Sequence, residues 1–408
     1  MPEEPYYVDA DGHLVEHPTG IQEYAPTEMR DRVWHVETDA DDVEWVVMGD
    51  AREPANVYAA AAAAGFSDEE KQRAWAGQMR YSEIPGGAYD TKERLAAMDE
   101  DGIDLSVLYP TMLLGVFGYP DRDVALATCR AYNDWLADHC AESDGRLYGA
   151  AVIPQWDAEL AAAEIRRAGA SPYLVAGFLR PNPTVDWKPL SDPAYDPIWQ
   201  AACDVDLAIG FHPLLSGDIP GACRGMRINE LRLDTPWMRG EMHLASPLPG
   251  APMGYDNHFF AQAIANPVDM MSAIAFMTGG GVCQRFPDLR CVFLEANGGW
   301  IVPWLERLDH HYEEFGFDVP WLTEEPSAFF RRSCWISFDP DESTLAFTAS
   351  SPLVGADRIV WASDYPHPDA KYPGTTRELA EATASLDEAA RRTIAGQSTL
   401  ALYGIEGR

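Results

Sequence analysis

The sequence predicts an α/β protein built on a single (β/α)8 TIM barrel with two insertions on its catalytic face. Three observations support this fold class. Short apolar or β-branched runs recur along the 408 residues, amphipathic helical patterns lie between most of them, and polar side chains stand where several of the runs end. Alternating strands and helices are typical of parallel sheets, and eight strands favour a closed barrel. We therefore expect one domain over residues 1–408.

The eight predicted strands share an apolar core of four to seven residues. They cover residues 6–9, 105–109, 147–153, 174–179, 207–211, 291–295, 334–338 and 358–363. Helical periodicity between them is clearest over residues 125–140, 158–169 and 301–315. The tail from residue 374 onward predicts two closing helices.

Two gaps between predicted strands are too long for simple crossovers. Residues 17–90 contain several Trp and Tyr and a Pro/Gly break, and residues 214–266 are rich in Gly, Pro and Met. Both gaps follow strands that end in polar side chains, so both insertions would emerge at the catalytic end of the barrel. Long insertions at that end are typical of lids and pocket walls.

Charge and hydropathy exclude several functional classes. The net charge is −35, from 65 acidic and 30 basic side chains, and such a surface repels phosphate backbones and anionic lipid. No apolar run reaches the roughly 18–20 residues that cross a bilayer, and the N-terminus lacks a secretory pattern. Seven cysteines without a CxxC pair favour reduced thiols. We expect a cytoplasmic protein with a small-molecule substrate, and neither nucleic acid nor a membrane as partner.

Candidate ligands for one divalent metal ion stand at three predicted strand ends. Asp11 and His13 follow the first strand, His212 follows the fifth and Asp364 follows the eighth. Strand ends of a barrel meet at its C-terminal face, and alternate side chains of a strand share a side. Carboxylate and imidazole ligands suit Zn, Mn or Fe, with Zn our first expectation. Each residue taken alone has a structural alternative, such as a turn at residues 11–12.

Further side chains are candidates for the surroundings of the metal. Glu295 follows the sixth strand and is a candidate general acid, an extra ligand or a hydrogen-bond partner of a ligand histidine. His258 lies in the second insertion and is a candidate to enter the pocket from a lid. The candidate substrate contacts are Glu16, Arg180, Asn297 and His367, and the alternative partners for a substrate carboxylate are Arg52 and Arg80.

The chain resembles the amidohydrolase superfamily, in the branch that includes aminocarboxymuconate-semialdehyde decarboxylase and gamma-resorcylate decarboxylase. The segments that carry the resemblance are VDADGHLVE (8–16), ERLAAMDEDGIDLSVLYPT (93–111), GFHP (210–213), GVCQRFPDLRCVFLEANGGW (281–300) and WASDYPHP (361–368). The resemblance implies that Asp11, His13, His212 and Asp364 bind the metal. It also implies that Asp364 exchanges a proton with water or substrate, and that the chain forms a homodimer or larger homo-oligomer. Glu295 stands where the related decarboxylases carry a histidine.

The leading functional expectation is hydrolysis, in which metal-activated water attacks a small aromatic or conjugated carbonyl compound such as an amide, a lactone or a ketone with a cleavable C–C bond. Asp364 would take the proton of the water, and Glu295 or His258 would protonate the leaving group. The first alternative is non-oxidative decarboxylation of an aromatic or enoic carboxylic acid, which the replacement of histidine by Glu295 weakens. Two further hypotheses are a dehydrating cyclase or condensing enzyme and a catalytically inactive ligand-binding barrel. Release of carbon dioxide would separate decarboxylation from the rest.

Overall fold

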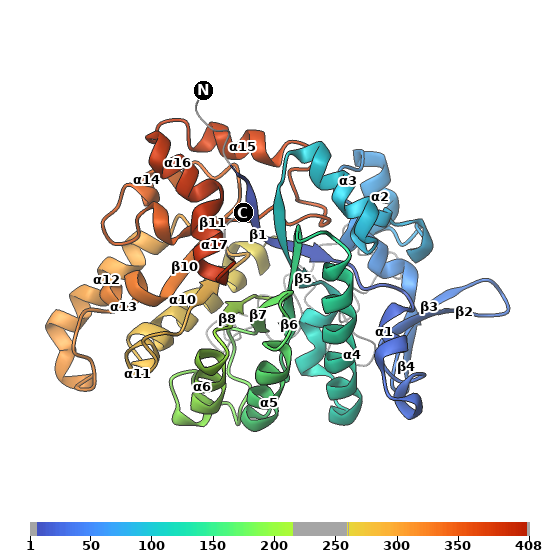
Figure 1. Ribbon diagram of the computed structural model, residues 1–408, viewed down its shortest axis with the longest axis horizontal. Coiled ribbons are helices and arrows are strands. Elements are labelled where there is room, and N and C mark those ends of the chain that lie inside the picture. Colours follow the sequence, from blue (N-terminus) through green and yellow to red (C-terminus); the bar gives the residue numbers. More distant parts are fainter. Residues whose placement is uncertain (1–5, 215–258, 260, 406–408) are drawn as a thin grey trace.

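Eight parallel strands form one sheet that curls into a nearly closed barrel with helices around it, as the computed structural model shows (Figure 1). The structure describes residues 6–214, 259 and 261–405. The strands are adjacent in the order of the sequence. Their bounds are β1 Val8–Leu14, β5 Leu105–Pro110, β6 Leu147–Val152, β7 Leu174–Leu179, β8 Ala208–Phe211, β9 Cys291–Phe293, β10 Cys334–Phe338 and β11 Ile359–Trp361. The predicted (β/α)8 barrel is confirmed.

The barrel closes between its first and last strands through two backbone hydrogen bonds. The N–H of His13 donates to the carbonyl of Tyr365 at 2.8 Å, and the N–H of Asp364 donates to the carbonyl of Asp11 at 3.1 Å. Three of these four residues are predicted metal ligands. The seam that closes the barrel therefore fixes the backbone of the ligands relative to one another.

The first strand is longer than the sequence predicted. Its expected span was residues 6–9, whereas β1 runs from Val8 to Leu14, so Asp11 and His13 lie within the strand. The pairing of β1 with β5 shifts register between Asp9 and Gly12, and irregularities of this kind re-aim side chains. The Asp-Gly pair forms no turn here, because β5 on one side and the seam on the other bind the backbone of this segment.

Helices surround the barrel, and most of them connect consecutive strands. Asp121 and Asp157 cap α4 and α5, since each carboxylate accepts hydrogen bonds from two N–H groups of the first turn. The bounds of the barrel helices are α3 Thr91–Asp101, α4 Arg122–Ala141, α5 Ala158–Ala168, α6 Asp196–Asp204, α10 Asn266–Thr278, α11 Val282–Arg285, α12 Ile301–Phe315, α13 Pro326–Ser333 and α14 Leu345–Ala349. The tail forms two helical segments, as predicted. The first is α15 Thr375–Ala382, and in the second a π-helical turn, Thr393–Gln397, joins α16 Glu388–Arg392 directly to α17 Ser398–Tyr403.

The first insertion contains a small antiparallel sheet that the sequence did not predict. Its strands are β2 His35–Thr38, β3 Glu44–Met48 and β4 Ala51–Pro54, and the short helices α1 Gly20–Tyr24 and α2 Asp68–Trp75 flank it in the chain (Figure 1). Most of the second predicted insertion, residues 214–266, lies outside the described residues. A lid or pocket-wall role for either insertion stays a prediction.

The barrel strands are buried along nearly their whole length, as in parallel sheets covered on both faces. The six cysteines within the described ranges have free thiols, as predicted. No helix in the part of the chain that the structure describes is long and apolar enough to cross a bilayer.

Candidate metal centre

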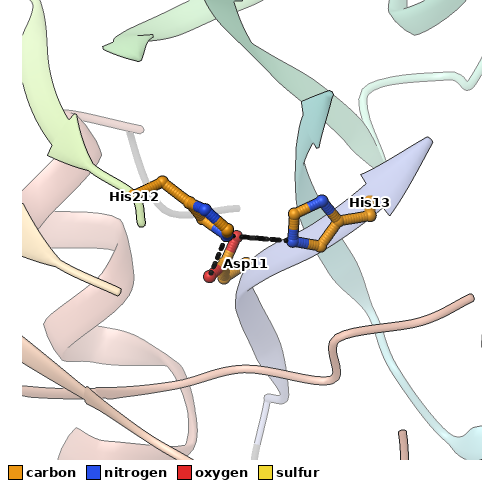
Figure 2. Close-up of side chains that lie close together, drawn as sticks. All are labelled: Asp11, His13 and His212. Carbon is orange, nitrogen blue, oxygen red and sulfur yellow. Dashed lines mark hydrogen bonds and ion pairs between the residues drawn. The ribbon is translucent and has the colours of Figure 1, made fainter. Parts of the chain in front are cut away.

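Three of the predicted ligands converge on one point at the C-terminal end of the barrel strands (Figure 2). Asp11 and His13 come from β1, and His212 directly follows β8. The Nε2 atoms of the two histidines are 3.2 Å apart. Asp11 Oδ1 lies 3.5 Å from His13 Nε2, and Asp11 Oδ2 lies 3.7 Å from His212 Nε2. The side chains are between 0% and 2% exposed, so solvent does not separate them.

The fourth predicted ligand, Asp364, joins the same cluster from the segment after β11. Its Oδ1 lies 3.5 Å from His13 Nε2. A divalent ion about 2.1 Å from each ligand atom places neighbouring ligand atoms about 3–3.5 Å apart. Three of the four observed separations, 3.2–3.5 Å, fall within that spacing, and the fourth, 3.7 Å between Asp11 Oδ2 and His212 Nε2, is slightly longer. The structure therefore brings the predicted ligands Asp11, His13 and His212 together, and it places Asp364 against His13 in a second group with His367.

The two histidines present Nε2 lone pairs to the centre. His13 Nδ1 lies 2.9 Å from the carbonyl oxygen of Pro110, and His212 Nδ1 lies 2.8 Å from that of Pro213. A carbonyl only accepts hydrogen bonds, so each neutral ring carries its hydrogen on Nδ1 and has none on Nε2. The short contact between the two Nε2 atoms is therefore no hydrogen bond. A cation between them would turn a repulsive contact into two coordination bonds.

The ionisation of the cluster also fits a cation. Burial lowers the pKa of His212 to about 3, and burial and neighbouring imidazoles hold the pKa of His13 well below its usual value. Burial, followed by the charges of Asp364 and Glu295, raises the pKa of Asp11 well above its usual value. Asp11 Oδ1 is buried and has no hydrogen-bond partner within the described ranges. A divalent ion would bind the neutral imidazoles, offset the repulsion between the carboxylates and give the buried oxygen of Asp11 a partner.

A buried arginine holds the two ligand-bearing segments together from behind. Arg94 of α3 is 1% exposed. Its Nη1 donates to the carbonyl of His13 at 2.8 Å and its Nη2 to the carbonyl of Tyr365 at 3.3 Å, while its guanidinium lies over the Tyr365 ring. Sequence reasoning missed Arg94, because an arginine in a helix gives no sign of the strand that it faces.

A buried aspartate joins two strands and the segment after β11, beside Arg94. Asp9 accepts hydrogen bonds from the hydroxyls of Ser106 and Ser363, both at 2.7 Å, and from the N–H of Ser363 at 2.8 Å. These contacts tie β1 to β5 and to the segment after β11. The signal in the sequence was a charged residue inside an apolar strand, which predicts a buried polar network.

Two further site residues lie against the ligands. His367 Nδ1 is 2.7 Å from Asp364 Oδ1, its Nε2 is 3.1 Å from Thr111 Oγ1, and its ring lies 4.1 Å from the His13 ring. Glu295 Oε2 is 3.0 Å from His212 Nε2. The structure thus places His367 and Glu295 at the metal centre, and His258 lies outside the described residues.

Glu16 is anchored away from the cavity. Its carboxylate is fully buried and accepts hydrogen bonds from the backbone N–H groups of Thr111, Met112 and Leu113 at 2.9–3.1 Å. Burial raises the pKa of Glu16 to about 7 even though these bonds lower it. Since both oxygens are bonded to the backbone after β5, the geometry favours an anchoring role over the expected substrate contact.

The remaining predicted substrate contacts are bonded to residues other than the four candidate ligands. Arg180 is buried and donates to Asn182 Oδ1 at 2.9 Å, and its charge, after burial and other contacts, contributes to the low pKa of His212. Asn297 donates to Asp339 Oδ2 at 2.9 Å. Arg52 and Arg80, the alternative partners for a substrate carboxylate, form ion pairs at the small antiparallel sheet, with Glu37 and Asp42 respectively.

A cavity of about 110 Å³ adjoins the cluster. Its lining includes Asp11, Asp364 and Glu295, together with Asn297 and Lys371. A small molecule in this cavity would therefore reach the metal centre from one side, next to the carboxylate of Asp364.

Comparison with known proteins identifies one family along almost the whole chain. A model of the Amidohydrolase family matches residues 8–405. The 2-amino-3-carboxymuconate-6-semialdehyde decarboxylase of Dictyostelium discoideum is 24% identical over 337 residues, which cover 80% of each chain. The gamma-resorcylate decarboxylase of Rhodococcus jostii is 26% identical over 324 residues, covering 77% of this chain and 87% of the relative.

The fold also matches solved structures. One is a 5-carboxyvanillate decarboxylase from Novosphingobium aromaticivorans with bound manganese and 3-methoxy-4-hydroxy-5-nitrobenzoic acid. It superposes with a TM-score of 0.62 at 18% identity and covers 98% of this chain and 97% of its own. At this identity the likeness concerns the fold.

Proposed function

Because this chain belongs to the amidohydrolase family, we propose that it is a metal-dependent decarboxylase that releases carbon dioxide from a small aromatic or enoic carboxylic acid. The observation that carries the proposal is the convergence of Asp11, His13 and His212 beside a cavity, with Asp364 against His13 and lining the same cavity. Hydrolysis was the leading expectation from the sequence. The relatives named as decarboxylases of carboxylic acids support decarboxylation better.

Asp11, His13, His212 and Asp364 are the residues that would hold one divalent ion. The ion, when bound, would supply positive charge that offsets the negative charge of a substrate carboxylate and of the electrons left behind when the C–C bond breaks. The donor set suits Zn²⁺ and Mn²⁺, and manganese is bound in the solved 5-carboxyvanillate decarboxylase.

Asp364 is the proposed proton carrier. It lines the cavity, and His367 holds its Oδ1 at 2.7 Å. In the reaction the bond between the carboxylate and its carbon breaks, carbon dioxide leaves, and the electron pair remains on that carbon. A proton from the Asp364 carboxyl completes the C–H bond, and solvent then returns a proton to Asp364. The sum is one carboxylate and one proton consumed for one carbon dioxide and one C–H bond formed.

The neighbouring residues position the substrate in this proposal. The buried cation of Arg180 near His212 attracts a negatively charged substrate group. Asn297, at the cavity wall, offers an amide to a polar substituent. We also propose that the chain forms a homodimer or larger homo-oligomer, which light scattering on the purified protein tests directly.

The proposal is tested by offering the protein, loaded with Mn²⁺ or Zn²⁺, gamma-resorcylate, 5-carboxyvanillate, an aromatic amide and an aromatic lactone. We expect one equivalent of carbon dioxide from at least one acid and, in D₂O, one deuterium at the vacated carbon by NMR. Asp364→Asn should lower kcat by about 10²–10⁴-fold, because the amide carries no transferable acid proton.

The matched control is Asp318→Asn, the same exchange at an exposed residue after α12, which should leave turnover unchanged. Cleavage of the amide or lactone with incorporation of ¹⁸O from water, without release of carbon dioxide from either acid, would contradict the decarboxylase and support the hydrolase.

A further inference from the structure

Glu295 Oε2 lies 3.0 Å from Nε2 of the predicted metal ligand His212. We propose that Glu295 is a fifth protein ligand of the metal and that Gln262 and Asn266 are positioning residues that hold its carboxylate. The inference rests on the metal centre of the proposed function but not on the reaction that this centre catalyses.

The contact between Glu295 and His212 is the first support. Two atoms lie close to His212 Nε2. Glu295 Oε2 is 3.0 Å from it and His13 Nε2 is 3.2 Å from it. His212 carries its hydrogen on Nδ1, because the carbonyl of Pro213 can only accept it, so Nε2 cannot donate to Glu295. A carboxylate oxygen and a nitrogen lone pair at this distance repel each other unless they share a partner.

A proton on Glu295 does not account for the contact in the metal-bound protein. A protonated Glu295 could donate to His212 Nε2 only if that lone pair were available. The lone pair is taken once His212 binds the metal, so Glu295 Oε2 must then either bind the same ion or move away. The 3.0 Å separation equals the spacing of neighbouring ligands around an ion about 2.1 Å from each.

The other carboxylate oxygen accepts a hydrogen bond from one amide, which a second amide orients. Gln262 Nε2 donates to Glu295 Oε1 at 3.3 Å. Asn266 Nδ2 donates to Gln262 Oε1 at 2.9 Å, which turns the NH₂ group of Gln262 toward Glu295, and it also lies 3.3 Å from the carbonyl of Glu295. With Oε1 in this bond, Oε2 is the oxygen that faces His212. Gln262 lies in a π-helical turn, residues 261–265, and such turns recur at functional sites.

The backbone of Glu295 gives independent support. Its φ angle is +45°, in the left-handed region that non-glycine residues rarely adopt. Asp364, one of the four ligands, has a φ angle of +54°. Such conformations persist where the surroundings fix them and cluster at functional sites. Two carboxylates on different strand ends thus reach the same centre from similarly unusual backbones.

The test measures Mn²⁺ binding without substrate, on the full chain stripped of metal and then titrated with Mn²⁺ alone. Free Mn²⁺ is followed by its electron paramagnetic resonance signal, and water bound to protein-held Mn²⁺ by proton relaxation. We expect Glu295→Ala to weaken binding by at least about 10-fold and to add one bound water, and Glu295→Asp to recover part of the affinity. Glu313→Gln, on the exposed face of α12, is the control for loss of one negative charge and should match the wild type.

The positioning role is tested by a double-mutant cycle. Gln262→Ala should weaken Mn²⁺ binding less than Glu295→Ala, and the double variant should bind no more weakly than Glu295→Ala, because Gln262 acts only through Glu295. Circular dichroism checks that Glu295→Ala is folded. If the folded variant binds Mn²⁺ with wild-type affinity and wild-type hydration, the ligand role is overturned, whatever the catalytic activity of the variant. Additive losses in the cycle would overturn the positioning role. Absence of decarboxylase activity leaves these binding results intact, so the two proposals fail separately.

Discussion

Gly12 is the residue where the metal ligands meet the polar network behind them. It lies between Asp11 and His13, and a Cβ at this position would come within 2.6 Å of Ser106 Oγ and 2.7 Å of both Arg94 Nη2 and Asp9 Oδ2. Real Cβ atoms do not approach polar atoms so closely, and these three atoms belong to one buried network. The glycine of the DGH motif is therefore required for close approach and not for a turn.

Gly12→Ala should accordingly disturb stability and metal binding together. Overpacking of a dense site costs about 1–3 kcal/mol of the free energy of unfolding, and displacement of Asp9 or Arg94 would shift the backbone of His13. Urea unfolding and metal content measure the two effects. Gly316→Ala is the matched control, since its Cβ would meet only Tyr312 at 3.6 Å. Equal stability and metal content of the Gly12 and Gly316 variants would show that the network tolerates the methyl group.

The proximity of the candidate ligands could be predicted from the sequence at the residue scale, whereas the residues that support them could not. Asp11, His212 and Asp364 can be recognised because they are polar residues at or near the ends of strands in an alternating strand–helix pattern. Arg94 and Gln262 act through contacts between segments far apart in the chain, which no local pattern records. Glu16 illustrates the converse error, because proximity to His13 in sequence suggested a substrate contact, while its side chain binds the backbone after β5.

At the scale of elements, α4 carries a buried histidine that links helix packing to pH. His139, in the last turn of α4, is buried, contacts Thr91 Oγ1 of α3 at 3.1 Å and packs against Trp135. Burial lowers the pKa of His139 from 6.5 to about 4. In the unfolded chain His139 therefore binds a proton near pH 6.5, whereas in the folded chain it binds one only near pH 4. The stability due to neutral His139 is complete above pH 6.5 and declines as the pH falls toward 4.

His139→Gln should flatten this decline. The pKa shift of His139 corresponds to about 3 kcal/mol of the free energy of unfolding, which the wild type loses between pH 6.5 and 4. The variant should not lose this amount relative to its own free energy of unfolding at pH 7. Urea unfolding at several pH values gives both slopes. His310→Gln, on the exposed face of α12, is the control and should retain the wild-type slope. An unchanged slope in His139→Gln would mean that other groups cause the loss of stability in acid.

The sequence predicted the elements of the barrel better than those of the first insertion. Every barrel strand was found because each is an apolar run between helices, as parallel strands covered on both faces must be. The sheet β2–β4 was missed because β2 and β4 are partly exposed and carry no apolar run, and because no helical pattern accompanies the apolar run of β3 at residues 45–48. The end of β1 was misplaced because Asp and Gly are turn formers, and only tertiary hydrogen bonds keep them in the strand.

At the scale of the whole molecule, the excess of acids shapes stability. The chain carries 65 acidic and 30 basic side chains and a net charge of −35, so repulsions outnumber the ion pairs that can form. Self-repulsion at high net charge destabilises the compact state, and salt screens it over about 10 Å at 0.1 M and about 3 Å at 1 M. We therefore expect Tm at pH 7 to rise as NaCl increases from 0.1 to 1 M, and to rise less at pH 5. A Tm that stays constant or falls with salt at pH 7 would show that attractive ion pairs dominate.

We propose that one end of the barrel holds one catalytic divalent ion through Asp11, His13, His212 and Asp364. The most direct test is the metal content of protein purified without chelator, by elemental analysis, beside His212→Ala and the exposed control His310→Ala. We predict about one Zn or Mn per chain in the wild type and in the control, and loss of most of it in His212→Ala. Folded wild-type protein that takes up no metal under metal-replete conditions would contradict the claim.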